Sequence, residues 1–170
     1  MWKSNDLMRR LDLRAPIVQG PFGSGLSAVD LVVAVSESGG LGSFGVHHLD
    51  GAGIRDVAAK IRARTRRDFA LNLWMPLGDS DDPQLTGAQW KTALAPLTPL
   101  FEELRVPLPE RPARFGPRFD EQLETVLELA PRVFSFIFGV PSAETLERCR
   151  RGGIFTIGAA TTAAEAKLLA

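Results

Sequence analysis

Asn72 is the polar residue whose position most strongly indicates a binding function. It lies inside the apolar segment Leu71–Leu73, and a buried amide without a hydrogen-bond partner costs roughly 1–3 kcal/mol. An amide donates and accepts hydrogen bonds at once, as the edge of a flavin or another heterocycle requires. An amide that bonds only to neighbouring backbone is an equally good interpretation of this residue on chemical grounds.

A glycine-rich turn follows the first apolar segment of the chain. Gly20, Pro21 and Phe22 run into Gly23-Ser24-Gly25, and glycine lets backbone approach a flat or phosphorylated ligand closely. The turn is not the G-x-G-x-x-G dinucleotide fingerprint, because Ala28 stands where the third glycine would be. Packing of a tight turn is therefore the simpler interpretation of these glycines.

The remaining reactive side chains give weaker signals. His47 and His48 are the only histidines, and adjacent histidines in a loop are usually solvated. No cluster with metal-ligand spacing surrounds them, so no metal site is predicted. Ser135 lacks the G-x-S-x-G elbow of a nucleophile. Cys149 stands between two arginines on an expected helix, where we expect it at the surface.

These residues lie in a regular alternation of short strands and helices. Strands are predicted at 15–21, 41–46, 69–74, 133–139 and 154–158. Helices are predicted at 28–38, 54–64, 120–130 and 142–151, with Ser27, Ser142 and Thr162 as N-caps and a short helix near 6–13. The pattern predicts an α/β fold whose parallel sheet is either doubly wound or a barrel. In both, ligands bind at the carboxyl ends of the strands.

The segment 75–118 interrupts this alternation after the third strand. It holds eight of the 12 prolines, and one helix is expected around Gly87–Leu104, broken near Pro96 and Pro99. We interpret the segment as a long insertion. It is either a lid or binding segment, or a variable excursion without a function.

Composition narrows the class of protein. A length of 170 residues suits one domain, and 45% hydrophobic residues allow a packed core. Lys+Arg and Asp+Glu are 20 each, so nothing points to nucleic acid or to an anionic membrane. One cysteine allows no internal disulfide, and no apolar run approaches the roughly 18 residues of a membrane helix. Without a signal-peptide pattern, we expect a cytoplasmic protein.

Several segments, in order, resemble the nitronate monooxygenase family. They are Pro16–Pro21, Leu31–Ser36 with Gly39–Ser43, Leu71–Trp74, Phe134–Gly139, and Ile157–Thr162 with Glu165-Ala166. The resemblance runs from about Leu11 to Ala170 and implies a TIM-type (β/α) barrel that binds FMN. It implies an enzyme that oxidises alkyl nitronates with O₂ to carbonyl compounds and nitrite. By the same resemblance, backbone at Gly20, Pro21 and Phe22 lines the flavin, and Asn72 hydrogen-bonds to it.

The chain departs from the family pattern in three respects. Ile137 stands where many members have His or Thr, and the turn Gly20–Phe22 replaces the usual Ala-Pro-Met. The family's catalytic histidine, in a Gly-Gly-His segment, is expected beyond Ala170, so no catalytic residue is assigned. About five of eight βα units are expected, which predicts an incomplete barrel with open sheet edges that invite self-association.

Two alternatives to nitronate oxidation stay open at this point. The first is an oxidoreductase like the FMN-dependent enoyl-acyl-carrier-protein reductases, which share the first three strands. They usually lack a strand like Ser135–Gly139, and this favours the nitronate enzymes. The second is a catalytically inactive remnant, which the absence of the histidine segment favours.

Overall fold

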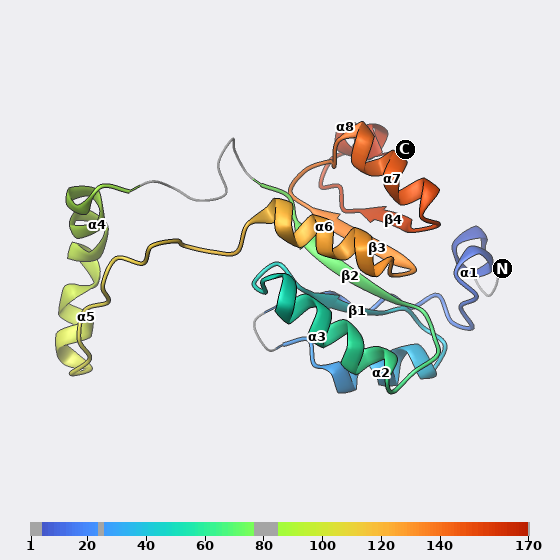
Figure 1. The fold of residues 1–170 in the computed structure, drawn as a ribbon, viewed down its shortest axis with the longest axis horizontal. Coiled ribbons are helices and arrows are strands. Elements are labelled where there is room, and N and C mark those ends of the chain that lie inside the picture. Colours follow the sequence, from blue (N-terminus) through green and yellow to red (C-terminus); the bar gives the residue numbers. More distant parts are fainter. Residues whose placement is uncertain (1–4, 24–25, 77–84, 170) are drawn as a thin grey trace.

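The computed structural model describes residues 5–23, 26–76 and 85–169. Its centre is a parallel sheet of β1 (Gly42–Gly45), β2 (Phe69–Trp74), β3 (Val133–Ile137) and β4 (Phe155–Gly158), in that order (Figure 1). Strand order therefore follows chain order. A doubly wound sheet would reverse direction at a switch point, whereas a barrel wall keeps this order.

The predicted strand 15–21 pairs with the sheet over fewer residues than expected. It pairs with the chain only at a parallel bridge between Val18 and Leu41, where Leu41 N–H donates to the Ile17 carbonyl at 2.9 Å and Gln19 N–H donates to the Leu41 carbonyl at 2.9 Å. The prediction of a full strand was wrong in length. Proline at both ends of the segment removes the backbone donors that a longer ladder needs.

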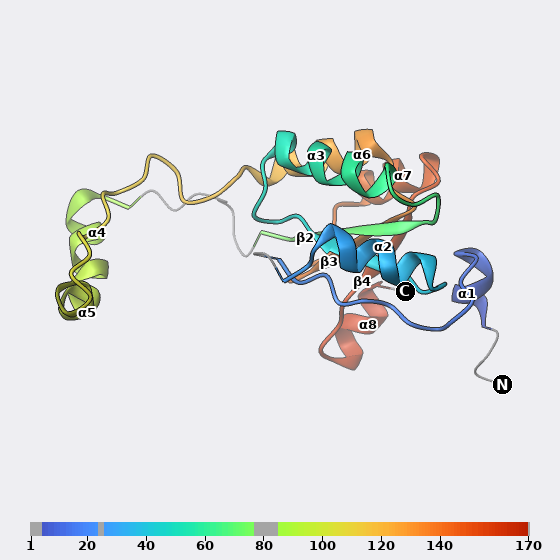
Figure 2. The ribbon, with the colours of Figure 1, turned by 90° about the horizontal axis from the view of Figure 1, so that it is seen from below.

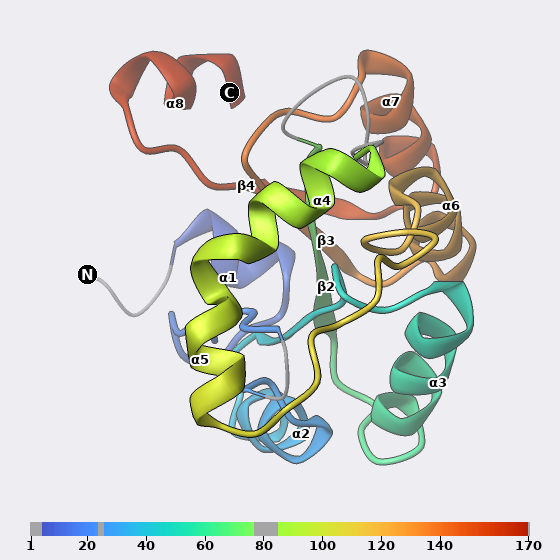
Figure 3. The same cartoon turned by 90° about the vertical axis from the view of Figure 1, so that its left-hand side faces the viewer.

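Five helices follow one another in an arc around the sheet (Figure 3). They are α2 (Val29–Glu37), α3 (Gly51–Arg62), α6 (Phe119–Leu129), α7 (Ala143–Arg151) and α8 (Ala163–Leu169). The short helix α1 (Asp6–Arg10) lies at the amino ends of the strands. There Leu11 packs with Leu41, Ala70 and Val133 in a small cluster that closes this end of the sheet.

The two faces of β2 have different partners. Phe69, Leu71 and Leu73 belong to the main hydrophobic core, which contains buried residues of α2, α3, α6 and α7. Side chains alternate along a strand, so Asn72 and Trp74 project from the opposite face, toward the inside of the arc. Ala70 on that face already belongs to the cluster at the amino end. Asn72 and Trp74 therefore lie beyond it, toward the carboxyl end.

Two of the three predicted N-caps are confirmed. The Ser142 and Thr162 hydroxyls cap α7 and α8, accepting from the N–H groups of residues 145 and 165 at 3.1 Å each. The Ser27 prediction was wrong, because Ala28 is the N-cap of α2 and makes no side-chain bond. Cys149 was also placed wrongly, since α7 turns it into the core, where burial raises the pKa of its thiol. It is therefore no reactive surface thiol.

The insertion stands away from the sheet on the side of the strands' carboxyl ends (Figures 1 and 2). It contains α4 (Gly87–Leu94), the 3₁₀ turn η1 (Ala95–Leu97) and α5 (Thr98–Glu103), which confirms the predicted helix and its interruption at the prolines. No residue of these three elements is buried. Residues 77–84 of the insertion lie outside the described part. Across the residues that the structure describes, no helix is long and apolar enough to cross a membrane.

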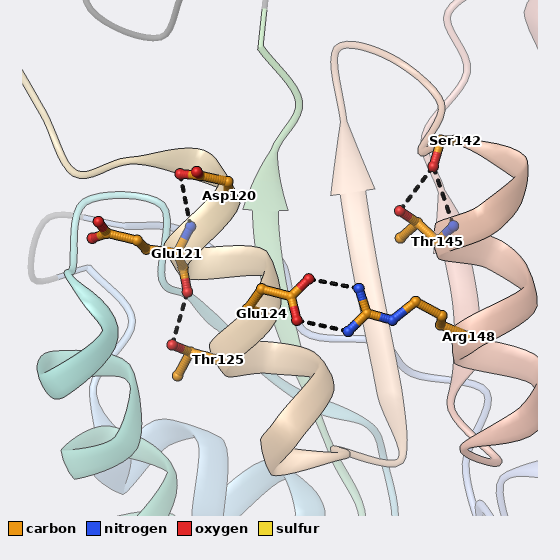
Figure 4. Close-up of polar contacts among 7 residues, drawn as sticks. All are labelled: Asp120, Glu121, Glu124, Thr125, Ser142, Thr145 and Arg148. Carbon is orange, nitrogen blue, oxygen red and sulfur yellow. Dashed lines mark hydrogen bonds and ion pairs between the residues drawn. The ribbon is translucent and has the colours of Figure 1, made fainter.

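An ion pair joins two helices of the arc and gives a first prediction (Figure 4). The Arg148 guanidinium of α7 donates to both carboxylate oxygens of Glu124 on α6, at 2.5 and 2.6 Å, and lowers the pKa of that carboxyl. A lowered pKa stabilises the fold above the ordinary value of 4.5 and this contribution is lost as the pH falls through the lowered value. Arg148→Gln should lower the urea midpoint slightly at pH 7.

Urea unfolding at pH 7 and at a pH well below 4.5 checks this prediction, because the contribution of the pair decreases as the pH falls through the lowered pKa of Glu124. Arg151→Gln is the control, since Arg151 makes only a 3.8 Å contact with Glu147. An equal loss for Arg148→Gln at both pH values would show that the guanidinium acts through packing instead.

Candidate functional site

The backbone of the first turn lies directly on the end of β1. A Cβ atom added to Gly45 would lie 2.6 Å from the Pro21 carbonyl oxygen and 3.0 Å from the Gly23 nitrogen. Only glycine therefore allows this close approach. Gly45 is the register partner of Asn72 on β2. The sheet thus brings together two groups singled out in the sequence, the turn at 20–22 and Asn72; Ser24 and Gly25 lie outside the described residues.

Asn72 has one hydrogen bond and one free acceptor. Its side chain is 1% exposed, and its amide nitrogen donates to the Ser135 hydroxyl on β3 at 3.0 Å. The Oδ1 atom is buried without a partner within the described chain. Such an atom costs roughly 1–3 kcal/mol. The Asn72 amide therefore bonds to a side chain and not to the neighbouring backbone, as the alternative interpretation required, and its free oxygen is available to accept an N–H.

The side chain of His47 packs against more of the protein than the sequence indicated. Its ring stacks on Trp74 with centroids 3.7 Å apart and planes 9° apart, and Trp74 meets Phe138 edge-on at 5.3 Å. Burial, and then the neighbouring His48, lower the pKa of the His47 imidazole, so it is neutral at neutral pH. Only His48 is exposed as expected for a loop histidine. Of the two histidines predicted to be solvated, His47 is only partly exposed.

Gln122 is a site residue that the sequence analysis missed. It is buried on α6, and its amide nitrogen donates to the carbonyls of His47 at 2.8 Å and Leu49 at 2.7 Å, with a longer contact of 3.4 Å to Val46. Gln122 thereby holds the loop between β1 and α3. One signal could have revealed it, because Gln122 precedes the buried Val126 by four residues and so lies on the apolar face of the helix.

The carboxyl ends of β3 and β4 border an apolar cleft of about 560 Å³. Ile137, Phe138 and Val140 line one side, and Leu168 and Leu169 of α8 line another. Ile137 thus puts a hydrocarbon side chain in the wall of this cleft, at the position where the expected pattern has a polar side chain. This part of the site suits apolar groups of a ligand.

A family model described as nitronate monooxygenase matches residues 5–170. This chain belongs to the nitronate monooxygenase family. The probable nitronate monooxygenase of Staphylococcus haemolyticus is 31% identical to it over 166 residues, and that of Staphylococcus aureus strain MSSA476 is 30% identical. Each match covers 98% of this chain and 45% of the relative. This family member therefore spans about half the length of the curated relatives it matches.

Solved structures agree with this assignment. Nitroalkane oxidase from Streptomyces ansochromogenes superposes with a TM-score of 0.79 at 30% identity, over 96% of this family member and 44% of that chain. FabK from Thermotoga maritima superposes with a TM-score of 0.65 at 17% identity, over 96% and 39%, which shows the fold alone. The predicted α/β fold, part of a TIM-type (β/α) barrel, is confirmed.

Proposed function

We propose that this member of the nitronate monooxygenase family binds FMN at the carboxyl ends of its strands. The enzyme to which this barrel portion contributes would oxidise alkyl nitronates with O₂, giving carbonyl compounds and nitrite. The observation that carries the proposal is the free Oδ1 atom of buried Asn72, next to a turn whose backbone lies on Gly45. Family membership favours this reaction over that of an enoyl-acyl-carrier-protein reductase.

The residues present fit a flat heterocycle with polar edges. Backbone at Gly20, Pro21 and Phe22 would line FMN, and the Asn72 side-chain oxygen would accept a hydrogen bond from an N–H of the flavin ring. Bound FMN supplies the electron-transfer chemistry between substrate and O₂. Ser135 orients the Asn72 amide through their hydrogen bond, which leaves the free oxygen in a fixed position. The stacked rings of His47 and Trp74 lie at this end of the sheet.

The replacement Asn72→Ala tests this proposal. Loss of the free acceptor should weaken FMN binding by about tenfold or more, since an N–H of the flavin left buried without its acceptor costs about 1–3 kcal/mol and 1.4 kcal/mol is a factor of ten. The measurement is the visible absorption spectrum of the purified chain after FMN is added and the excess removed. A retained band, shifted from that of free FMN, reports binding.

Ser135→Ala is the matched control, because it keeps the Asn72 amide and removes only the group that orients it. It should weaken FMN binding less than Asn72→Ala, and circular dichroism should show both variants folded. No retained flavin band in the unmodified chain would contradict FMN binding by this chain and would favour the inactive alternative. Equal retention by Asn72→Ala would remove Asn72 from the cofactor site.

A further inference from the structure

Three buried side-chain polar atoms lack a hydrogen-bond partner in the part of the chain that the structure describes. They are Ser27 Oγ, His47 Nδ1 and Asn72 Oδ1. Two of them lie at the same end of the sheet, His47 in the loop that follows β1 and Asn72 on β2. The backbone N–H of Val46, which precedes His47, donates to the Asn72 carbonyl at 2.9 Å. Buried polar atoms in native proteins are nearly always paired. Asn72 is accounted for by the proposed cofactor, but His47 has no role yet.

The position of the His47 ring is fixed from three directions. Trp74 stacks on one face of the imidazole. On the side of the first turn, a Cβ atom at Gly23 would lie only 2.2 Å from the imidazole Cε1 atom, so the ring fits against bare backbone. Gln122 holds the carbonyl of His47 itself at 2.8 Å. A side chain held in this way loses little conformational entropy when it binds a ligand.

The rings near His47 are apolar and exposed. Trp74 is 44% exposed and Phe138, in contact with it, is 53% exposed, while Phe22 on the adjacent turn is 64% exposed. An alkyl nitronate has two unlike ends, an apolar chain and a planar head with two oxygens that share one negative charge. The exposed rings suit the chain. The imidazole of His47 is the group beside them that can donate an N–H to the head.

We propose that His47 is a substrate-binding residue, whose imidazole donates an N–H hydrogen bond to an oxygen of the nitronate head while Trp74 and Phe138 contact the alkyl chain. This inference rests on the proposed function and names the residue that recognises the substrate. Hydrogen bonds to a charged group are worth about 1.5–3 kcal/mol. His47→Leu, which removes the N–H donor, should therefore weaken nitronate binding by about tenfold or more.

The chain has only two histidines, so imidazole signals in a ¹H–¹⁵N correlation spectrum can be assigned by substitution. Propyl-1-nitronate is added under nitrogen to the chain with FMN and to the chain without it. His48→Leu is the matched control, because His48 is the exposed neighbour of His47. The expected result is a saturable shift of the His47 imidazole signals that is also present in His48→Leu. The dissociation constant, followed through the indole signal of Trp74, should be raised about tenfold in His47→Leu.

Two results would overturn the inference. One is a His47 signal that does not move at high nitronate concentration in either preparation. The other is an unchanged affinity in His47→Leu. A separate measurement tests the proposed function itself: the absence of a retained flavin band in the absorption spectrum would contradict FMN binding. A chain that retains FMN but leaves His47 unmoved keeps its cofactor and loses this assignment.

Discussion

Gly45→Ala should reduce FMN retention by about tenfold to a hundredfold while leaving the chain folded. The new methyl group would lie 2.6 Å from the Pro21 carbonyl oxygen and 3.0 Å from the Gly23 nitrogen. Both are backbone atoms, so a side-chain rotation cannot relieve the contact and the whole turn must move. Overpacking of this kind costs about 1–3 kcal/mol, and 1.4 kcal/mol is a factor of ten in binding. The turn would then leave the position beside Asn72 from which it lines the proposed cofactor.

The absorption assay described for Asn72→Ala measures this loss, and far-ultraviolet circular dichroism shows whether the sheet survives. Gly87→Ala is the matched control, because a Cβ atom there meets nothing within 4 Å. It should retain FMN like the unmodified chain. If Gly45→Ala also retains FMN fully, the first turn takes no part in the cofactor site, and the assignment of Gly20, Pro21 and Phe22 is wrong.

The elements of this fold could be predicted where the local pattern is strong. The run 69–74 is apolar except for Asn72 and forms β2, and the prolines at 96 and 99 interrupt the helix of the insertion where expected. The predicted first strand forms only a single bridge. A β-ladder requires a neighbouring strand to pair with as well as apolar residues in the segment. Cys149 was predicted at the surface but is buried in the core. The two flanking arginines do not determine which way the side chain between them faces.

The site was predictable only where one residue carries the signal. Asn72 stood out because an amide in an apolar strand needs partners, and its free oxygen is what the structure shows. The ring stack of His47 with Trp74 and the bond from Gln122 to the His47 carbonyl join residues 27 and 75 positions apart. Contacts at such separations depend on strand register and on helix rotation. No local pattern near His47 contains either.

Gln122→Met should lower the free energy of unfolding by about 2–3 kcal/mol. Methionine keeps the length and nearly the volume of glutamine but removes the amide that donates to the carbonyls of His47 and Leu49. Two partly buried carbonyls then lose their donor, at about 1–3 kcal/mol for a buried group left unpaired. Urea unfolding measures the change. The reactivity of the Cys149 thiol gives a second reading, because the chain's single cysteine is fully buried until the fold opens.

Two companion variants separate the hydrogen bonds from the packing at this position. Glu121→Met places the same side chain on the exposed neighbouring residue of α6 and should change stability little. Gln122→Glu keeps the shape but turns a donor into acceptors that face carbonyl oxygens, so it should destabilise at least as much as Gln122→Met. If Gln122→Met were neutral, the loop would be held by its own contacts. If it destabilises and also shifts the His47 imidazole signals, α6, which directly follows the insertion, sets the position of the proposed substrate-binding side chain.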